Sequence, residues 1–246
     1  MSKRILLGMS GGVDSSASAV ILKQKGYEVI GATMKLWDDG CPINHANDAK
    51  KVCDKLSIEH HIFDCKKDFK EHVIDDFIRC YECGKTPNPC VECNKYLKFG
   101  EFNKIAEELE CDYIATGHYA KVQYSEKYKQ YVLKKSNEEQ KDQSYFLYRV
   151  PKEILPKIIF PLEDFSNKEE IRNIARESDL IVAEKEESQE ICFIPDNNYV
   201  EFIKNNSNNK FKEGNIVNNK GEIFGKHNGI INYTVGQRKG LGISYK

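Results

Sequence analysis

Short apolar runs alternate with helical patterns along the first half of the chain. Four compact apolar runs, each bounded by glycine or polar residues, are predicted to form buried strands: residues 5–7, 28–34, 58–63 and 113–115. Helices are predicted where apolar side chains recur at helical spacing, over residues 17–25 and 102–109. Strands that alternate with helices favour a parallel sheet covered on both faces. We therefore expect an α/β fold with a doubly wound parallel sheet.

The second half of the chain has a different character. Residues 122–133 have the pattern of a β-hairpin, and residues 152–179 have a helical pattern with Ser166 as the predicted N-cap. From residue 204, an asparagine-rich stretch leads into Gly-rich sequence with short apolar pairs. We predict a first domain over residues 1–203 and the start of a small β-rich domain over residues 204–246. The turn-rich ending suggests a fragment of a longer protein.

Composition narrows the class of protein. The 246 residues include 37 Lys and Arg against 38 Asp and Glu, so a uniformly basic nucleic-acid coat is excluded and any RNA contact must be local. No apolar run approaches the roughly 18 residues that span a bilayer, and the N-terminus lacks the apolar core of a signal peptide, so we expect a cytoplasmic protein without a membrane partner. The nine cysteines are an odd number. In a reducing compartment they are free thiols, metal ligands or redox catalysts.

A glycine- and serine-rich heptad, Ser10 to Ser16, lies between a predicted strand and a predicted helix. Its two glycines let the backbone approach an anion, and the helix that follows directs free N–H groups toward it. Asp14 either orients the loop or holds Mg²⁺. The heptad has neither the ending of a Walker A loop nor a dinucleotide fingerprint. It predicts a phosphate site of another kind, with a structural turn as the alternative.

Two further segments present cysteines. In residues 86–95, two prolines hold an extended loop with Cys90 and Cys93 before a helix that is predicted to begin near Asn94. A thiol at a helix N-terminus near lysines should be a better thiolate. Cys192 stands alone between apolar residues, and by itself it would be interpreted as a small buried hydrophobe.

The cysteine spacing leaves a metal alternative open. Two C-x-x-C pairs, Cys80 with Cys83 and Cys90 with Cys93, could form a tetrahedral Zn²⁺ site, although six residues between the pairs is tight. That arrangement would leave Cys192 without a role. The remaining cysteines are interpreted as core or incidental thiols: Cys41, Cys53, Cys65 and Cys111.

Together, the motifs of the chain resemble the tRNA-specific 2-thiouridylase (MnmA) family of PP-loop ATP pyrophosphatases, from Lys3 to Gly242. The matching pieces, in chain order, are GMSGGVDSS, MKLWDD, TPNPCVECNK, ATGHYA, KDQSYFL, SQEICFI and VGQRKGLG. The resemblance implies an enzyme that uses ATP and Mg²⁺ to adenylate the C2 oxygen of uridine 34, the tRNA wobble base. A persulfide then delivers sulfur and AMP leaves. The partners implied are a tRNA with uridine at position 34 and a sulfur-donor protein or sulfide.

The resemblance also implies roles for particular residues. Cys192 would carry the persulfide, and Cys93 would resolve it and can form a disulfide with Cys192. The ATP site would comprise Gly8, Met9, Ser10, Gly11, Gly12, Val13, Asp14, Ser15, Met34 and Gly117. The target base would meet Asn88, Pro89 and Cys90, and the tRNA would meet His118, Lys141, Asp142 and Gln143.

Two departures from the family pattern matter. Many members carry Asp where this chain has Cys90, so the chain has a set of three cysteines, Cys90, Cys93 and Cys192. Three thiolates with one open position suit a [4Fe–4S] cluster whose free iron binds sulfide. Sulfide on a cluster is therefore a second hypothesis beside the persulfide. The family's C-terminal β-barrel, which helps to grip tRNA, is absent from these 246 residues.

Two other functions compete with tRNA thiolation. A PP-loop ligase or amidotransferase acting on a small molecule would explain the phosphate loop but leave Cys93 and Cys192 idle. A thiol-based metal or redox module would use the loop only to bind a nucleotide. Pyrophosphate release that depends on tRNA would indicate thiolation, release with a small acid would indicate the ligase, and no release would indicate the metal or redox module.

Overall fold

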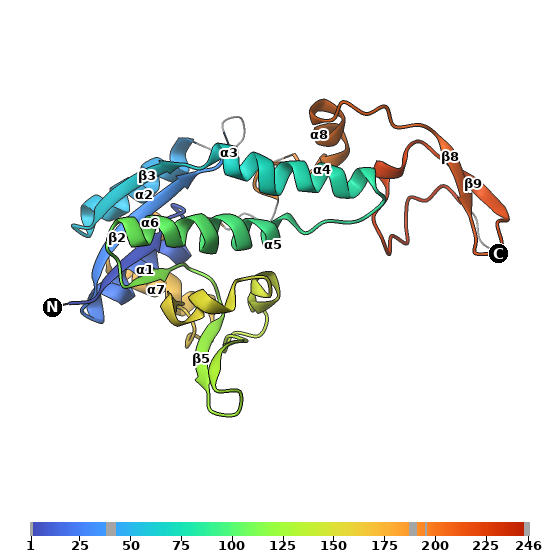
Figure 1. The fold of residues 1–246 in the computed structure, drawn as a ribbon. Helices are drawn as coiled ribbons and strands as arrows, with labels where there is room; N and C mark the ends of the chain where they lie inside the picture. Colours follow the sequence, from blue (N-terminus) through green and yellow to red (C-terminus); the bar gives the residue numbers. More distant parts are fainter. Residues whose placement is uncertain (1, 38–42, 187–190, 195, 244–246) are drawn as a thin grey trace.

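A parallel five-stranded sheet forms the centre of the first domain (Figure 1). The computed structural model describes residues 2–37, 43–186, 191–194 and 196–243. The strand order is β3-β2-β1-β4-β7, and every pair is parallel. The strands are β1 (Arg4–Gly8), β2 (Glu28–Lys35), β3 (Glu59–Asp64), β4 (Tyr113–Ala115) and β7 (Ile158–Ile159).

Helices pack on both faces of this sheet. Strand β1 shows why, because Ile5 and Leu7 join one buried cluster while Leu6 joins another on the opposite face. The first cluster is covered by α1 (Val13–Gln24), α2 (Ile43–Lys55) and α7 (Lys168–Glu177). The second is covered by α6 (Phe102–Glu108) and the residues before it. The predicted doubly wound α/β fold is confirmed.

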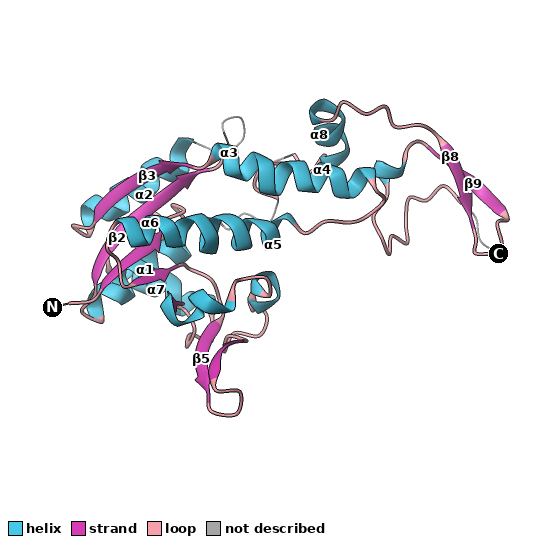
Figure 2. Cartoon of the chain, viewed as in Figure 1, coloured by secondary structure: helices cyan, strands magenta, loops and turns pink. Residues whose placement is uncertain are grey.

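Two long helical rods extend from the sheet and lie side by side (Figures 1 and 2). Both contain a π-helical stretch. A third buried cluster, which includes Phe77, Cys93 and Phe193, lies where they meet. The first rod is α3 (Lys66–Phe69), η1 (Lys70–Ile74) and α4 (Asp75–Glu82); the second is α5 (Pro89–Cys93), η2 (Asn94–Glu101) and α6.

The predicted hairpin is confirmed as β5 (Lys121–Ser125) paired with β6 (Gln130–Lys134). Tyr124 lies directly opposite Tyr131, with ring centroids 5.5 Å apart, which is cross-strand packing. Short 3₁₀ helices follow at η3 (Ser144–Leu147) and η4 (Lys152–Lys157).

The prediction of helical structure throughout residues 152–179 is wrong. The segment contains η4, then the two-residue strand β7, then α7. Prolines at 156 and 161 flank β7 and prevent a continuous helix. The N-cap of α7 is Asn167 rather than Ser166, and its side chain accepts a hydrogen bond from the Glu170 N–H at 3.0 Å.

Beyond the sheet domain, α8 (Tyr199–Asn206) leads to an antiparallel pair, β8 (Gly214–Val217) and β9 (Ile223–His227), and to the short helix η5 (Ile230–Asn232). The expected β-rich region after the first domain is therefore present. The boundary placed at residue 204 falls within α8 and stays a prediction. In the described part of the chain, every helix is too short or too polar to cross a membrane.

Candidate active site

The glycine-rich loop lies where β1 ends and α1 begins, as the sequence predicted. Gly11 has φ +70°, a conformation that favours glycine, and Gly12 is the N-cap of α1 without a side-chain cap. The first N–H groups of α1 thus remain available for an anion, with the positive end of the helix dipole behind them. Helix α1 begins at Val13, four residues earlier than predicted.

Serine hydroxyls brace the loop from inside. The buried Ser15 donates to the Gly12 carbonyl at 3.1 Å, and its Oγ lies 3.2 Å from the Ser10 Oγ. Ser16 also donates to the Gly12 carbonyl, at 2.9 Å. Ser16 therefore holds the helix start, while Ser10 and Ser15 fix the shape of the anion cradle.

Asp14 is held by two residues that the sequence did not indicate. Its Oδ1 accepts hydrogen bonds from the Lys168 ammonium at 2.6 Å and the Tyr119 hydroxyl at 2.9 Å. Lys168 is the first residue of α7 and lies 154 positions after Asp14, so no local motif links them. Of the two roles considered for Asp14, the geometry favours orienting the loop. Lys168 also brings a cation beside the glycine-rich loop.

A second distant lysine contacts the cradle. Lys185 donates to the Gly11 carbonyl at 3.0 Å and to Asp48 on α2 at 2.8 Å. Its own carbonyl accepts from Arg172 on α7 at 3.2 Å. These contacts anchor Lys185 against the loop.

Gly117 closes the other side of the cradle. A Cβ at this position would lie 3.0 Å from two backbone atoms of α1, the Asp14 carbonyl carbon and the Ser15 nitrogen. A side chain here would force the start of α1 to shift by a few tenths of an ångström. Met34, the other residue expected at the adenosine, is half-buried near the end of β2 and packs against two of the core clusters.

Substitution of Gly117 by alanine should therefore displace the start of α1. We expect ATP to bind roughly 10-fold more weakly and the free energy of unfolding to fall by about 1–3 kcal/mol. Calorimetric titration and urea unfolding measure the two effects. Gly8→Ala is the matched control for stability, because its Cβ would lie no closer than 3.6 Å to any neighbour. Equal stability of the two variants would contradict the assignment.

The two candidate cysteines differ in exposure. Helix α5 begins at Pro89 rather than near Asn94, because proline suits the first helical position. Cys90 is exposed, whereas Cys93 is only 7% exposed within the cluster between the two rods. Burial raises the pKa of the Cys93 thiol, against the opposing effect of Lys98. The prediction that Cys93 is a favoured thiolate is thus wrong for this conformation.

Cys192 is exposed, so its interpretation as a buried hydrophobe is also wrong. Its neighbours Phe193 and Ile194 are buried in the same cluster as Cys93. The Phe193 ring packs on Phe77 at 5.4 Å between centroids. These contacts fix the Cys192 segment against the rods. The rest of its motif, residues 188–190, lies outside the described residues.

The described residues contain no group of three or more His, Cys, Asp or Glu side chains placed to hold a metal ion. The four cysteines of the zinc alternative are therefore not gathered. Nor are Cys90, Cys93 and Cys192, so a [4Fe–4S] cluster does not fit this conformation.

The other cysteines show the expected core character. Burial raises the pKa of Cys53 to about 12 and that of Cys65 to about 11, while Cys111 is half-buried. Cys41 lies outside the described residues.

Alkylation at pH 8 should follow this division. We expect iodoacetamide to modify the exposed Cys83, Cys90 and Cys192 at least roughly 10-fold faster than the buried Cys53 and Cys93. Peptide mapping by mass spectrometry over time gives the rates. Modification of Cys93 as fast as that of Cys90 in the native chain would contradict the burial of Cys93.

Two of the four residues predicted to contact tRNA, Asp142 and Gln143, form hydrogen bonds within the fold. Gln143 exchanges two hydrogen bonds with the Tyr119 backbone, at 2.8 and 3.1 Å. Asp142 accepts from the Ser136 N–H at 2.9 Å and the Ser144 hydroxyl at 2.6 Å. These bonds give the loop that carries Lys141 a fixed shape.

His118 is partly buried beside Phe99 and Phe160, and its Nδ1 lies 2.8 Å from the Thr116 hydroxyl. Burial holds the pKa of this imidazole well below its usual range. A neutral His118 can offer a hydrogen bond to RNA but not an ion pair to phosphate.

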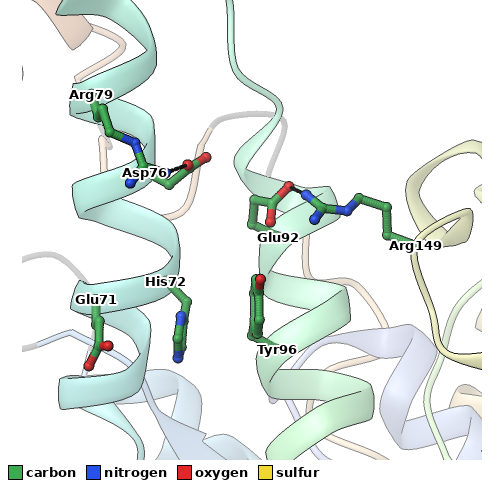
Figure 3. A pocket seen from close by; sticks show the side chains of 7 residues that line it. All are labelled: Glu71, His72, Asp76, Arg79, Glu92, Tyr96 and Arg149. Atoms are coloured by element: carbon green, nitrogen blue, oxygen red, sulfur yellow. Dashed lines mark hydrogen bonds and ion pairs between the residues drawn. The ribbon is translucent and has the colours of Figure 1, made fainter.

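A polar pocket opens between the two rods near the cysteine segment (Figure 3). His72 on the first rod stacks on Tyr96 of the second, with ring centroids 4.3 Å apart. Arg149, which follows η3, forms an ion pair with Glu92 on α5. The pocket is thus bounded by residues of both rods and of the segment after the hairpin: Glu71, His72, Asp76, Arg79, Glu92, Tyr96 and Arg149.

Two family profiles cover almost the whole chain. Residues 3–196 match one described as the tRNA methyl transferase HUP domain, and residues 200–246 match the PRC-barrel domain of the same description. A tRNA-specific 2-thiouridylase from Clostridioides difficile (strain 630) is 48% identical over 100% of this chain and 70% of its own length. Relatives of the same name from Clostridium beijerinckii and Clostridium kluyveri are 47% and 48% identical, again over 70% and 71% of their lengths. The chain belongs to the tRNA-specific 2-thiouridylase family.

Solved structures agree on the fold of this 2-thiouridylase family member. The U34-tRNA thiolase NcsA from Methanococcus maripaludis, solved with its [4Fe–4S] cluster, aligns with a TM-score of 0.50 at 20% identity, over 83% of this chain and 67% of that one. NMN synthetase from Francisella tularensis aligns with a TM-score of 0.51 at 13% identity, over 82% and 77%. At these identities the likeness concerns the fold alone.

Proposed function

We propose that this chain catalyses the ATP-dependent 2-thiolation of uridine 34 in tRNA. The observation that carries the proposal is the similarity to 2-thiouridylases, which covers both the phosphate loop and the Cys192 segment at 48% identity. The structure supports it with a phosphate loop that Lys185 contacts at Gly11, and with a Cys192 segment held against the rods through Phe193.

The family profile carries the description of a methyl transferase, but the site favours thiolation. Methyl transfer needs a methyl donor, whereas the loop at α1 is an anion cradle with free N–H groups and a neighbouring cation. Such a cradle suits the triphosphate of ATP. Cysteines on two elements that meet in one cluster suit sulfur transfer.

The first step is adenylation. The C2 oxygen of the uridine attacks the α-phosphorus of ATP, the bond to the β-phosphate oxygen breaks, and pyrophosphate leaves. The N–H groups at the start of α1 and the Lys168 ammonium would stabilise the charge that develops on pyrophosphate, with Mg²⁺ bound to ATP sharing it. Gly8 to Ser15, Met34 and Gly117 would form the nucleotide site.

The second step is sulfur transfer. The terminal sulfur of a Cys192 persulfide attacks C2, and AMP leaves with the former uridine oxygen. The Cys93 thiolate then attacks the Cys192 Sγ, the S–S bond breaks, and the transferred sulfur remains on C2. This leaves a Cys93–Cys192 disulfide for an external thiol to reduce. Cys93 must first leave its buried position, since the thiol, not the thiolate, is favoured there.

The geometry favours a persulfide over an iron–sulfur cluster. Within the described residues, Cys90, Cys93 and Cys192 do not come together as a metal-binding group. We therefore route no step through a cluster, and propose that Asn88, Pro89 and Cys90 meet the target base. We further propose that the sulfur comes from a donor protein that transfers persulfide sulfur to Cys192, or from sulfide that attacks the Cys93–Cys192 disulfide at the Cys192 Sγ, which breaks the S–S bond and leaves a Cys192 persulfide and a Cys93 thiol. We also propose that the enzyme works in the cytoplasm, where its tRNA substrate is found.

The deciding experiment supplies ATP, Mg²⁺, sulfide or a cysteine desulfurase with cysteine, and unmodified tRNA with uridine 34. Pyrophosphate release that requires the tRNA, with 2-thiouridine found by mass spectrometry after nuclease digestion, is expected. Pyrophosphate release with a small acid in place of tRNA would indicate a small-molecule ligase. Nucleotide binding without pyrophosphate release would indicate the redox or metal-binding module.

A further inference from the structure

Two exposed tyrosines lie on, and directly after, one short helix. Tyr145 on η3 is 66% exposed and Tyr148, which follows η3, is 65% exposed, although aromatic rings gain by burial. Their ring centroids are 6.1 Å apart at an interplanar angle of 41°. We call these two neighbouring exposed residues the tyrosine pair.

The tyrosine pair is rigidly mounted on the helix that carries the cysteines. The buried Asn94, the residue after Cys93, donates from Nδ2 to the Phe146 carbonyl at 3.0 Å. Leu147 is buried in the core, and Arg149 is paired with Glu92 on α5. In Figure 1 the segment after the hairpin lies beside α5. Because the mounting is already ordered, the rings would lose little freedom on binding a ligand.

The hairpin tyrosines provide a contrast. Tyr124 and Tyr131 pair with each other across the strands, so packing accounts for them. Tyr145 and Tyr148, by contrast, are each about two-thirds exposed, and cross-strand packing of this kind does not account for them. In the surrounding segment, residues 141–157, Arg149 is paired with Glu92 and Lys157 with Glu107, so stacking rather than net charge would supply the affinity for an RNA base.

Aromatic surfaces beside basic residues are typical of sites for unpaired RNA bases, because every base has a face that can stack. A double helix hides those faces, so the surface fits a loop rather than a stem. We propose that the tyrosine pair is a stacking platform for unpaired anticodon-loop bases next to the target uridine. This inference rests on the proposed function and adds the residues that would hold the loop while the target base lies near Cys90.

The test measures binding of an anticodon stem–loop RNA that carries 2-aminopurine beside uridine 34. In the variant with both Tyr145→Ala and Tyr148→Ala, we expect affinity to fall about 10- to 100-fold and the quenching of 2-aminopurine on binding to disappear. The variant with Tyr145→Phe and Tyr148→Phe keeps the stacking faces and should bind like the native chain. Tyr128→Ala, a change at another exposed tyrosine, is the matched control.

Each other outcome overturns the platform. Native affinity for the RNA in the double alanine variant would overturn it. So would a loss of affinity in the double phenylalanine variant, or in Tyr128→Ala, as large as that in the double alanine variant. A dimer that becomes a monomer in the double alanine variant, with RNA affinity unchanged, would assign the pair to contact with a second copy. If the native chain neither binds the stem–loop nor releases pyrophosphate, the proposed function itself fails. If the native chain releases pyrophosphate and the double alanine variant still binds the stem–loop normally, only the stacking platform is refuted.

Discussion

Replacement of Cys192 by serine is expected to lower the rate of tRNA thiolation by roughly 10³-fold or more, since a hydroxyl cannot carry the persulfide sulfur. ATP binding should be unchanged, because Cys192 lies on the segment that packs against the rods through Phe193 and not in the α1 loop. Mass spectrometry of nuclease-digested tRNA measures thiolation, and calorimetry measures ATP binding.

Cys83→Ser is the matched control for this change. Cys83 is also an exposed cysteine, but it follows α4 and has no assigned role. It should thiolate tRNA at the native rate. Thiolation that persists in Cys192→Ser, or that is lost equally in Cys83→Ser, would refute the role of Cys192.

Replacement of Lys168 by methionine is expected to slow tRNA-dependent pyrophosphate release about 10²- to 10³-fold. The change removes the cation beside the cradle and leaves the Asp14 carboxylate with its Tyr119 partner alone, so negative charge faces the phosphates. A pyrophosphate-coupled assay under saturating tRNA measures the rate.

A second substitution tests whether the lost rate comes from the unpaired charge of Asp14. Asp14→Asn in the Lys168→Met background removes the uncompensated carboxylate, so it should recover part of the lost rate if repulsion is the cause. Lys121→Met, which breaks an exposed ion pair with Asp164, is the control and should have no effect. Native activity in Lys168→Met would contradict its placement in the phosphate site.

The sheet was largely predictable because local patterns determine it. Runs such as Ile5–Leu7 are apolar on both sides, as a strand covered on two faces requires. Strand β7 escaped prediction because only Ile158 and Ile159 pair, and they lie between prolines. The first rod, α3 to α4, was also not predicted from the sequence.

The candidate site was predictable only where its residues lie in one motif. The glycine loop is contiguous, so its place between strand and helix could be inferred. Lys168 and Lys185 reach it from 154 and 174 positions away, and folding alone brings them there. The burial of Cys93 likewise depends on Phe77 and Phe193, which belong to segments distant in sequence.

One turnover of a persulfide-loaded chain tests most directly whether Cys192 transfers sulfur to an ATP-activated uridine. Cys192 is charged with radiolabelled sulfur, free donor is removed, and ATP, Mg²⁺ and unmodified tRNA are added. One labelled 2-thiouridine is expected for each AMP and each pyrophosphate formed. Label that reaches tRNA without ATP, or AMP that forms while the label stays on the protein, would contradict this transfer.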